Sequence, residues 1–142
     1  ETIGFTEYNN LERIIPYTDL FLYDWKETNQ DLHNKFIGVS NELIYENLLK
    51  LDKAGAKIIL RCPVIPKHND REEHYIGIAG LADKLTNVVE INILPYHNLG
   101  SSKSENIGCD YPLPSFPPLS DLEKENCVSL IQSKTNNKIT FP

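Results

Sequence analysis

The chain alternates between short apolar runs and longer stretches in which apolar residues recur at helical spacing. The apolar runs predict three β-strands, at residues 20–23, 57–61 and 88–94. The amphipathic stretches predict helices at residues 8–15, 41–53, 70–85 and 120–133. Helical turns at 31–36 and a last strand at 138–141 complete the pattern. Because the run at 20–23 is apolar throughout, we expect this strand to be buried on both faces.

Three of the helices begin with residues that commonly cap helices. Ser40 predicts an N-cap for the helix at 41–53. Asp70 with Glu73, and Ser120 with Glu123, have the spacing of capping boxes, in which two side chains satisfy free N–H groups of the first turn. These positions therefore predict where the three helices start.

The predicted strands end at regular intervals. Tyr23 and Leu60 are 37 residues apart, and Leu60 and Ile93 are 33 apart. A helix between strands at this spacing is typical of right-handed βαβ units and a parallel sheet. Such units are too few here to close a barrel of eight, so we predict an α/β fold: an open or partial barrel, or one completed by sequence upstream. Pro63, which cannot donate a backbone hydrogen bond, is expected to end the second strand.

The composition is that of a soluble globular protein. The 142 residues suffice for one domain, with 40% apolar and 24% charged side chains. The net charge of −6 argues against a general nucleic-acid binder, which needs clustered Lys and Arg. No apolar run approaches the ~18–20 residues of a membrane span, and no stretch has the regions of a signal peptide. We therefore expect a cytoplasmic protein without a membrane or nucleic-acid partner.

The three cysteines, Cys62, Cys109 and Cys127, are far apart and form no CxxC pair. We interpret them as reduced, partly buried thiols rather than as a metal or redox centre.

Polar side chains follow each of the three strands. Asp24 and Lys26 end the first, Arg61 ends the second, and His97 follows the third. Each alone could be a solvated ion pair or a loop residue. In βα folds, however, the carboxyl ends of the strands meet at one mouth, where the active site lies. Together these side chains predict a shared site for a small ligand with a carboxylate and an amine, or with a phosphate.

The other candidates near these strands have a structural interpretation. Trp25 should point to the opposite face of its strand and pack under the adjacent helix. His33, His68 and His74 do not have the spacing of a helical metal pair, so we interpret them as surface residues.

Five segments resemble motifs of the activating enzymes of glycyl radical enzymes, of the pyruvate formate-lyase activating type. In chain order they are ETIGF at 1–5, LFLYDWK at 20–26, HNKFIGVSNELIYENL at 33–48, RCPVIPKHND at 61–70 and ILPYHNLG at 93–100. The resemblance covers essentially the whole chain. It implies a radical S-adenosylmethionine enzyme with a (β/α)6 barrel, of which residues 1–142 form the C-terminal half as a single partial-barrel domain. Within it, 98–118 is a long Pro-rich loop and 119–142 is a C-terminal helix and tail.

The resemblance also implies a function. In this family a 4Fe–4S cluster cleaves S-adenosylmethionine, and the resulting 5′-deoxyadenosyl radical takes a hydrogen atom from a glycine of a partner enzyme. That partner is pyruvate formate-lyase or another glycyl radical enzyme of anaerobic metabolism. The electron comes from a donor such as flavodoxin or ferredoxin.

Matching positions carry over the family's cofactor residues. Asp24 and Lys26 match a pair near S-adenosylmethionine. In this pair the Asp24 carboxylate orders the amino group of the methionyl moiety, and Lys26 contacts the carboxylate of that moiety. Arg61 matches a second residue that contacts the methionyl carboxylate. His97 matches a residue that contacts the adenosyl part. Thr2 is also expected beside the cofactor.

A monovalent cation site is implied next to the cofactor. Glu1 and Thr2 match the acidic residue and its neighbour that hold this cation together with Asp24.

One feature departs from the family. The three-cysteine motif Cys-x3-Cys-x2-Cys, which holds the cluster, is absent from the sequence. The chain begins at Glu1 and contains no Met, which suggests a piece of a longer product. We therefore expect it to have no iron–sulfur ligands, to bind little S-adenosylmethionine and to be inactive alone. Because a half-barrel leaves strand edges unpaired, we also expect self-association.

Two alternatives remain open. The chain could be a naturally truncated, non-catalytic binding module that docks on a glycyl radical enzyme. It could also be an unrelated βα enzyme acting on a small anionic metabolite.

Overall fold

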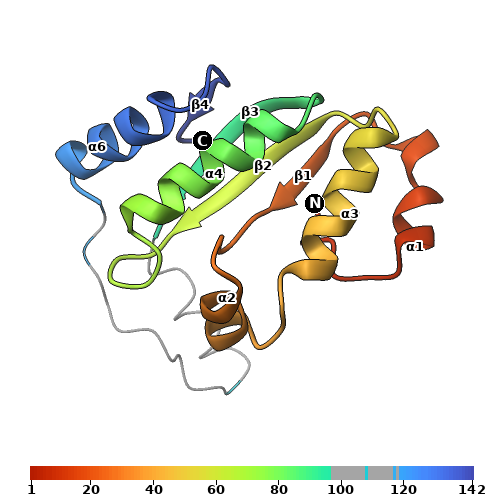
Figure 1. The fold of residues 1–142 in the computed structure, drawn as a ribbon, viewed down its shortest axis with the longest axis horizontal. Helices are drawn as coiled ribbons and strands as arrows, with labels where there is room; N and C mark the ends of the chain where they lie inside the picture. Colours follow the sequence, from red (N-terminus) through yellow and green to blue (C-terminus); the bar gives the residue numbers. More distant parts are fainter. Residues whose placement is uncertain (97–107, 109–116, 118) are drawn as a thin grey trace.

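The computed structural model describes residues 1–96, 108, 117 and 119–142 (Figure 1). Its elements in chain order are α1 (Tyr8–Glu12), the 3-10 helix η1 (Ile15–Tyr17), β1 (Phe21–Asp24), α2 (Gln30–Ile37), α3 (Glu42–Lys53), β2 (Ile58–Val64), α4 (Glu72–Lys84), β3 (Val88–Pro95), α6 (Asp121–Gln132) and β4 (Ile139–Thr140).

One sheet of four parallel strands, in the order β1-β2-β3-β4, organises the fold. The helices α3 and α4 lie in front of β1 and β2 in the view of Figure 1, and α6 packs beside α4. Strands that follow one another in the chain are thus neighbours in the sheet. The predicted α/β fold with parallel strands is confirmed, and it is the arrangement of a partial barrel.

The strands β1 and β2 are buried on one face only. In β1, Phe21 and Tyr23 are buried whereas Leu22 and Asp24 are half-buried, and β2 alternates in the same way. The expectation that strand 20–23 is buried on both faces is therefore wrong. The physical reason is that α3 and α4 both cover the same side of the sheet, so the hydrophobic core forms there.

Pro63 does not end β2, which continues to Val64. The carbonyl of Arg61 accepts a hydrogen bond from the N–H of Trp25 at 2.8 Å, so Arg61 and Pro63 present their backbone groups toward the β1 side. The named part of β1 ends at Asp24, the register partner of Arg61, so Pro63 lies past the last paired residue of β1. The carbonyl of Val64 accepts from the N–H of Tyr96 on the other side at 2.9 Å, and Pro63 and Val64 remain in register with β3, so β2 continues through this pairing.

Of the three predicted helix starts, the one at Ser120 is confirmed, the one at Ser40 is confirmed in part, and the one at Asp70 is wrong. Ser120 and Glu123 form a reciprocal capping box at the start of α6. Asp70 is exposed and does not cap α4, because Arg71, in extended conformation, occupies the N-cap position and Asp70 lies one residue before it. α3 starts one residue later than an N-cap at Ser40 predicts, but the Ser40 hydroxyl does accept a hydrogen bond from the N–H of Glu42 in its first turn at 3.2 Å.

The first residues of the chain run along the outer edge of β1. Thr2 donates its N–H to the carbonyl of Leu22 and accepts from the N–H of Asp24, each at 2.9 Å. Gly4 then turns away with a φ of +73° and lies against the buried ring of Tyr23. This pairing fixes Glu1 and Thr2 beside the end of β1.

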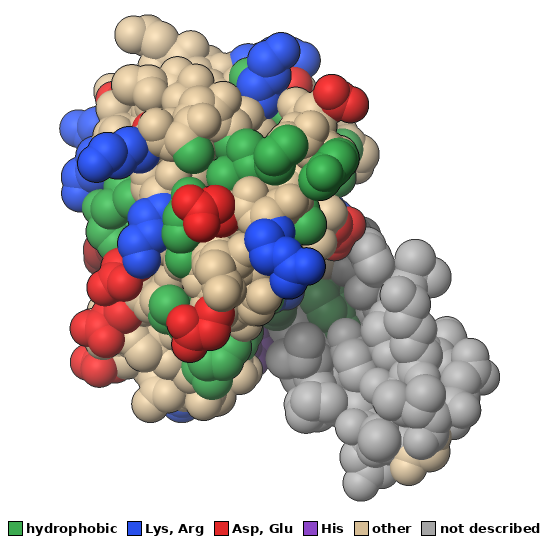
Figure 2. Space-filling view, turned by 90° about the vertical axis from the view of Figure 1, so that its right-hand side faces the viewer, with side chains coloured by type: hydrophobic (Ala, Val, Ile, Leu, Met, Phe, Trp, Pro, Cys, Tyr) green, Lys and Arg blue, Asp and Glu red, His purple; other side chains and the backbone are tan. Residues whose placement is uncertain are grey.

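The surface on the side of α1 and α3 mixes side chains of all kinds. Figure 2 shows acidic and basic side chains there between small hydrophobic patches. In the described part of the chain, no helix combines the length and the apolar character needed to span a bilayer.

Candidate functional site

A row of polar side chains crosses the sheet on the face opposite α3 and α4. Asp24 of β1 is in register with Arg61 of β2, Arg61 with Asn92 of β3, and Asn92 with Thr140 of β4. Residues in register on parallel strands point to the same face, so the four side chains are neighbours. The sequence interpretation missed Asn92 and Thr140, although a polar residue within the apolar run at 88–94 was a visible signal.

Four of the predicted site residues come together at the end of β1 and β2. An Arg61 Nη1 lies 2.5 Å from Glu1 Oε2 and 3.8 Å from Asp24 Oδ1. Lys26 Nζ lies 3.4 Å from Asp24 Oδ2. The side chains of Asp24 and Arg61 are only 18% and 22% exposed, so their charges are partly shielded from water. Two carboxylates and two cations thus share one site.

Asp24 has spare hydrogen-bonding capacity in this group. Its Oδ1 is buried and accepts no hydrogen bond from the described residues. A buried carboxylate oxygen without a donor is costly. The site therefore suits a ligand ammonium or a monovalent cation at this oxygen, and the polar end of S-adenosylmethionine fits these residues.

The other two predicted residues are placed differently. Thr2 lies beside Asp24 through the backbone, but its hydroxyl accepts a hydrogen bond from the N–H of Gly4 at 2.9 Å. His97 lies outside the described residues.

The described residues do not fit an iron–sulfur cluster. Cys62 and Cys127 are free and buried, as predicted, and Cys109 lies outside the described residues. Burial raises the pKa of the Cys62 thiol, and it raises that of Cys127 to about 11. Cluster ligands are thiolates, whereas burial keeps these two groups protonated.

Residues on β3 and β4 close the row with a satisfied network. Asn92 donates to Glu90 Oε1 at 2.6 Å and to Thr140 Oγ1 at 2.8 Å, and Lys138 donates to Glu90 Oε2 at 2.7 Å. The bonds from Lys138 and Thr140 lower the pKa of Glu90 to about 2. These contacts attach β4 to β3, which is a structural role.

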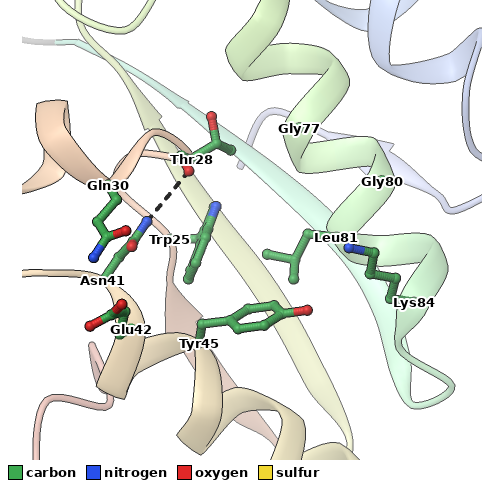
Figure 3. Close-up of a pocket in the computed structure, with 10 residues that line it drawn as sticks. All are labelled: Trp25, Thr28, Gln30, Asn41, Glu42, Tyr45, Gly77, Gly80, Leu81 and Lys84. Carbon is green, nitrogen blue, oxygen red and sulfur yellow. Dashed lines mark hydrogen bonds between the residues drawn. The ribbon is translucent and has the colours of Figure 1, made fainter.

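Trp25 points to the helix side of the sheet, as predicted. Its ring centroid lies 6.2 Å from that of Tyr45 on α3. A pocket of about 470 Å³ lies here, with residues of α3 and α4 facing one another across it (Figure 3). Gly77 lies close to Thr28, with 2.8 Å from an added Cβ to the Thr28 methyl carbon, so α4 approaches the β1–α2 loop closely. The aromatic pocket and the polar row are therefore on opposite faces of the sheet.

Two of the three histidines interpreted as surface residues are buried. His33 and His74 are 1% and 0% exposed, so this prediction is wrong for both, and His68 is half-buried. His74 lies four residues before Ile78 on α4 and shares its buried face, a helical signal that the sequence contains. His33 Nδ1 pairs with the carbonyl of Val39 at 2.7 Å, which satisfies it inside the α2–α3 turn.

A second charged cluster, which the sequence interpretation missed, lies behind Lys26. Glu27 is 1% exposed, and Arg71 contacts both of its carboxylate oxygens, at 2.8 and 3.2 Å. Burial alone would raise the pKa of Glu27, but the bonds from Arg71 and from the N–H of Asn29 lower it overall. His74 Nδ1 accepts from the N–H of Thr28 at 3.2 Å. The cluster fastens the β1–α2 loop to the start of α4.

The buried imidazole of His74 predicts a pH-dependent stability. Burial, opposed by Glu27, lowers its pKa from 6.5 to about 4. Between these values the unfolded chain binds a proton that the folded chain does not, so stability falls as the pH drops from 6.5 to 4. We expect a loss of about 3 kcal/mol over this window. His74→Asn keeps an acceptor for Thr28 but does not titrate.

The measurement is urea unfolding between pH 7 and pH 4 for both proteins. The difference between them isolates His74 from the other groups that titrate in acid. Equal pH dependence in His74→Asn would contradict the prediction.

Comparison with known proteins gives a consistent result. No protein-family model matches the chain. The chain is 37% identical over 125 residues to the indoleacetate decarboxylase activating enzyme of Tractidigestivibacter scatoligenes, covering 87% of this chain and 39% of that enzyme. It is 33% identical over 124 residues to the pyruvate formate-lyase-activating enzyme of Streptococcus mutans, covering 87% of this chain and 47% of that enzyme.

The fold matches a solved structure as well. A domain of pyruvate-formate lyase-activating enzyme from Bacteroides vulgatus superposes with a TM-score of 0.79 at 21% identity, over 99% of this chain and 78% of that chain. The chain thus shares this fold and spans less than half the length of the two curated relatives.

Proposed function

Since the chain is homologous to the activating enzymes of glycyl radical enzymes, we propose that it forms the part of such an enzyme that holds the methionyl end of S-adenosylmethionine. The observation that carries the proposal is the group of two carboxylates and two cations at the ends of β1 and β2. This group is electrically balanced. The amino-acid end of S-adenosylmethionine is balanced too, with one ammonium and one carboxylate, so the charges are complementary.

Each side chain of the group has a distinct role in this proposal. Asp24 Oδ1, which has no donor among the described residues, accepts hydrogen bonds from the ligand ammonium. Lys26 and Arg61 bind the ligand carboxylate. The Arg61 guanidinium does so with a planar pair of N–H donors, and the Lys26 ammonium does so as a point charge.

The neighbouring residues complete the site. Glu1 and Thr2, which the pairing with β1 fixes beside Asp24, hold a monovalent cation together with it. We assign His97 to the adenosyl part, on its position after β3.

In the whole protein, S-adenosylmethionine and a 4Fe–4S cluster supply the hydrogen-atom abstraction that creates a glycyl radical on a partner enzyme. The spacing of the three cysteines does not suit the cluster, so its ligands belong to sequence outside this chain. We propose that the partner is pyruvate formate-lyase or another glycyl radical enzyme. Flavodoxin or ferredoxin serves as electron donor, and the reaction takes place in the cytoplasm.

The test uses the full-length protein encoded by the gene. Asp24→Asn is expected to weaken binding of S-adenosylmethionine roughly 10- to 100-fold, because one charged hydrogen bond contributes about 1.5–3 kcal/mol. Calorimetry measures the binding, and electron paramagnetic resonance measures the glycyl radical on the partner. Glu125→Gln, on the exposed side of α6, is the matched control and should change neither.

Other results would point elsewhere. If the full-length protein does not bind S-adenosylmethionine, the proposed function is wrong. Docking on a glycyl radical enzyme without radical formation would support the non-catalytic module instead. For this chain alone we propose little S-adenosylmethionine binding and self-association through the outer edges of the sheet, which calorimetry and light scattering measure.

A further inference from the structure

Asn69, in the loop between β2 and α4, joins the ends of two strands. It is 4% exposed. Its Nδ2 donates to the carbonyl of Lys26 at 2.9 Å and to the carbonyl of Pro63 at 2.7 Å. Its Oδ1 accepts from the N–H of Ile65 at 2.7 Å. One side chain thus ties the backbone just after β1 to the backbone at the end of β2.

The chemistry of these contacts requires an amide. Both N–H groups of Asn69 meet carbonyl oxygens and its oxygen meets an N–H, so the amide orientation is determined by its partners. An aspartate would place a carboxylate oxygen against the carbonyls of Lys26 and Pro63. An aliphatic side chain would leave three partly buried backbone groups without these partners.

Arg71 of the same loop and Asn41 at the start of α3 fix Glu27, the residue that follows Lys26. Arg71 holds the side chain of Glu27, and Asn41 donates to the carbonyl of Glu27 at 3.2 Å. By contrast, the described contact of the Lys26 ammonium itself is one long ion pair with Asp24 at 3.4 Å, and its side chain is 33% exposed. The backbone of Lys26 is therefore fixed far more firmly than its side chain.

We propose that Asn69 is a positioning residue for the Lys26 ammonium. The lysine side chain is long and flexible, so the positions that its ammonium can reach depend on the position of the Lys26 backbone. Asn69 fixes that backbone position through its hydrogen bond to the Lys26 carbonyl. A pocket of about 490 Å³ lies beside both residues. The inference rests on the proposed function, in which Lys26 meets the carboxylate of S-adenosylmethionine. A misplacement of about 1 Å in a positioning contact can lower the reaction rate by up to about 100-fold.

A double-mutant cycle in the full-length protein tests the inference. Asn69→Ala is expected to raise the KM for S-adenosylmethionine about 10-fold or more, with a smaller change in kcat. In a Lys26→Met background the same substitution should change KM less than about 2-fold, because the ammonium that it positions is gone. Asn69→Ser, which retains one donor, is the second variant if Asn69→Ala does not fold.

A purely structural role would give a different pattern. Equal increases in KM in the wild-type and Lys26→Met backgrounds would overturn the positioning role. Asn10→Ala, which removes one exposed hydrogen bond on α1, is the matched control and should leave KM unchanged in both.

Amide exchange on this chain separates the inference from the proposed function. In Asn69→Ser, the amides of Thr28 and Asn29 should exchange at least 10-fold faster, whereas amides in β3 should not change. Unchanged exchange at Thr28 and Asn29 would overturn the inference even if the cofactor binds. Faster exchange in a protein that does not bind S-adenosylmethionine would show that Asn69 fixes the loop after β1. It would refute the proposed function but not this contact.

Discussion

Replacing Gly4 by alanine is expected to lower the free energy of unfolding by about 4 kcal/mol. Two costs add. The φ of +73° places residue 4 in the left-handed region, which disfavours any side chain. An added Cβ would also overlap the hydroxyl and ring of Tyr23. Tyr23 is fully buried and its hydroxyl donates to the carbonyl of Ile44 at 2.6 Å, so moving the ring aside breaks a buried hydrogen bond.

A second glycine supplies the control for this prediction. Gly55 has a φ of +80°, but an added Cβ there would meet nothing within 4 Å. Gly55→Ala therefore measures the backbone cost alone, about 1 kcal/mol. Urea unfolding of both variants gives the comparison. If the two substitutions cost the same, the close approach of Gly4 to Tyr23 has no energetic weight.

Replacing Arg71 by methionine is expected to cost about 3–5 kcal/mol of unfolding free energy. The substitution leaves Glu27 as a buried carboxylate that has lost both of its bonds to the guanidinium. Removing one partner of a buried ion pair is strongly destabilising because the other charge stays desolvated. The β1–α2 loop should loosen at the same time.

The double variant Glu27→Gln, Arg71→Met is the informative control. It removes the uncompensated charge, so we expect it to recover most of the lost stability. In Arg71→Met alone, burial raises the pKa of Glu27, so acidification should reduce the penalty as the carboxyl becomes protonated. Chemical unfolding at pH 7 and pH 5 measures both effects. No recovery in the double variant would show that Arg71 acts through packing and not through charge.

Local features of the sequence predicted the fold well. Apolar runs gave the strands, helical spacing gave α3, α4 and α6, and the Ser120–Glu123 pair gave a true cap. The predictions were wrong where contacts with neighbouring elements outweighed a local sequence preference. Pro63 continues β2 because β1 has already ended beside it, and strand 20–23 is half-buried because both flanking helices cover one face.

The candidate site divides in the same way. Glu1, Asp24, Lys26 and Arg61 were predicted from strand ends and motifs, and the structure brings them together. The second cluster was missed, since Glu27 and Arg71 are 44 residues apart and each looks like an ordinary surface charge.

The sequence by itself determined where the strands lie along the chain, their parallel direction and which polar residues end them. These follow from periodicity and chain connectivity, which are local properties. Only the tertiary structure decided which charges are buried and which are free to bind. Glu27 is neutralised by a guanidinium from another loop, whereas Asp24 keeps one oxygen without a donor among the described residues. Desolvation and pairing depend on neighbours in space, and close packing alone brings distant residues into contact.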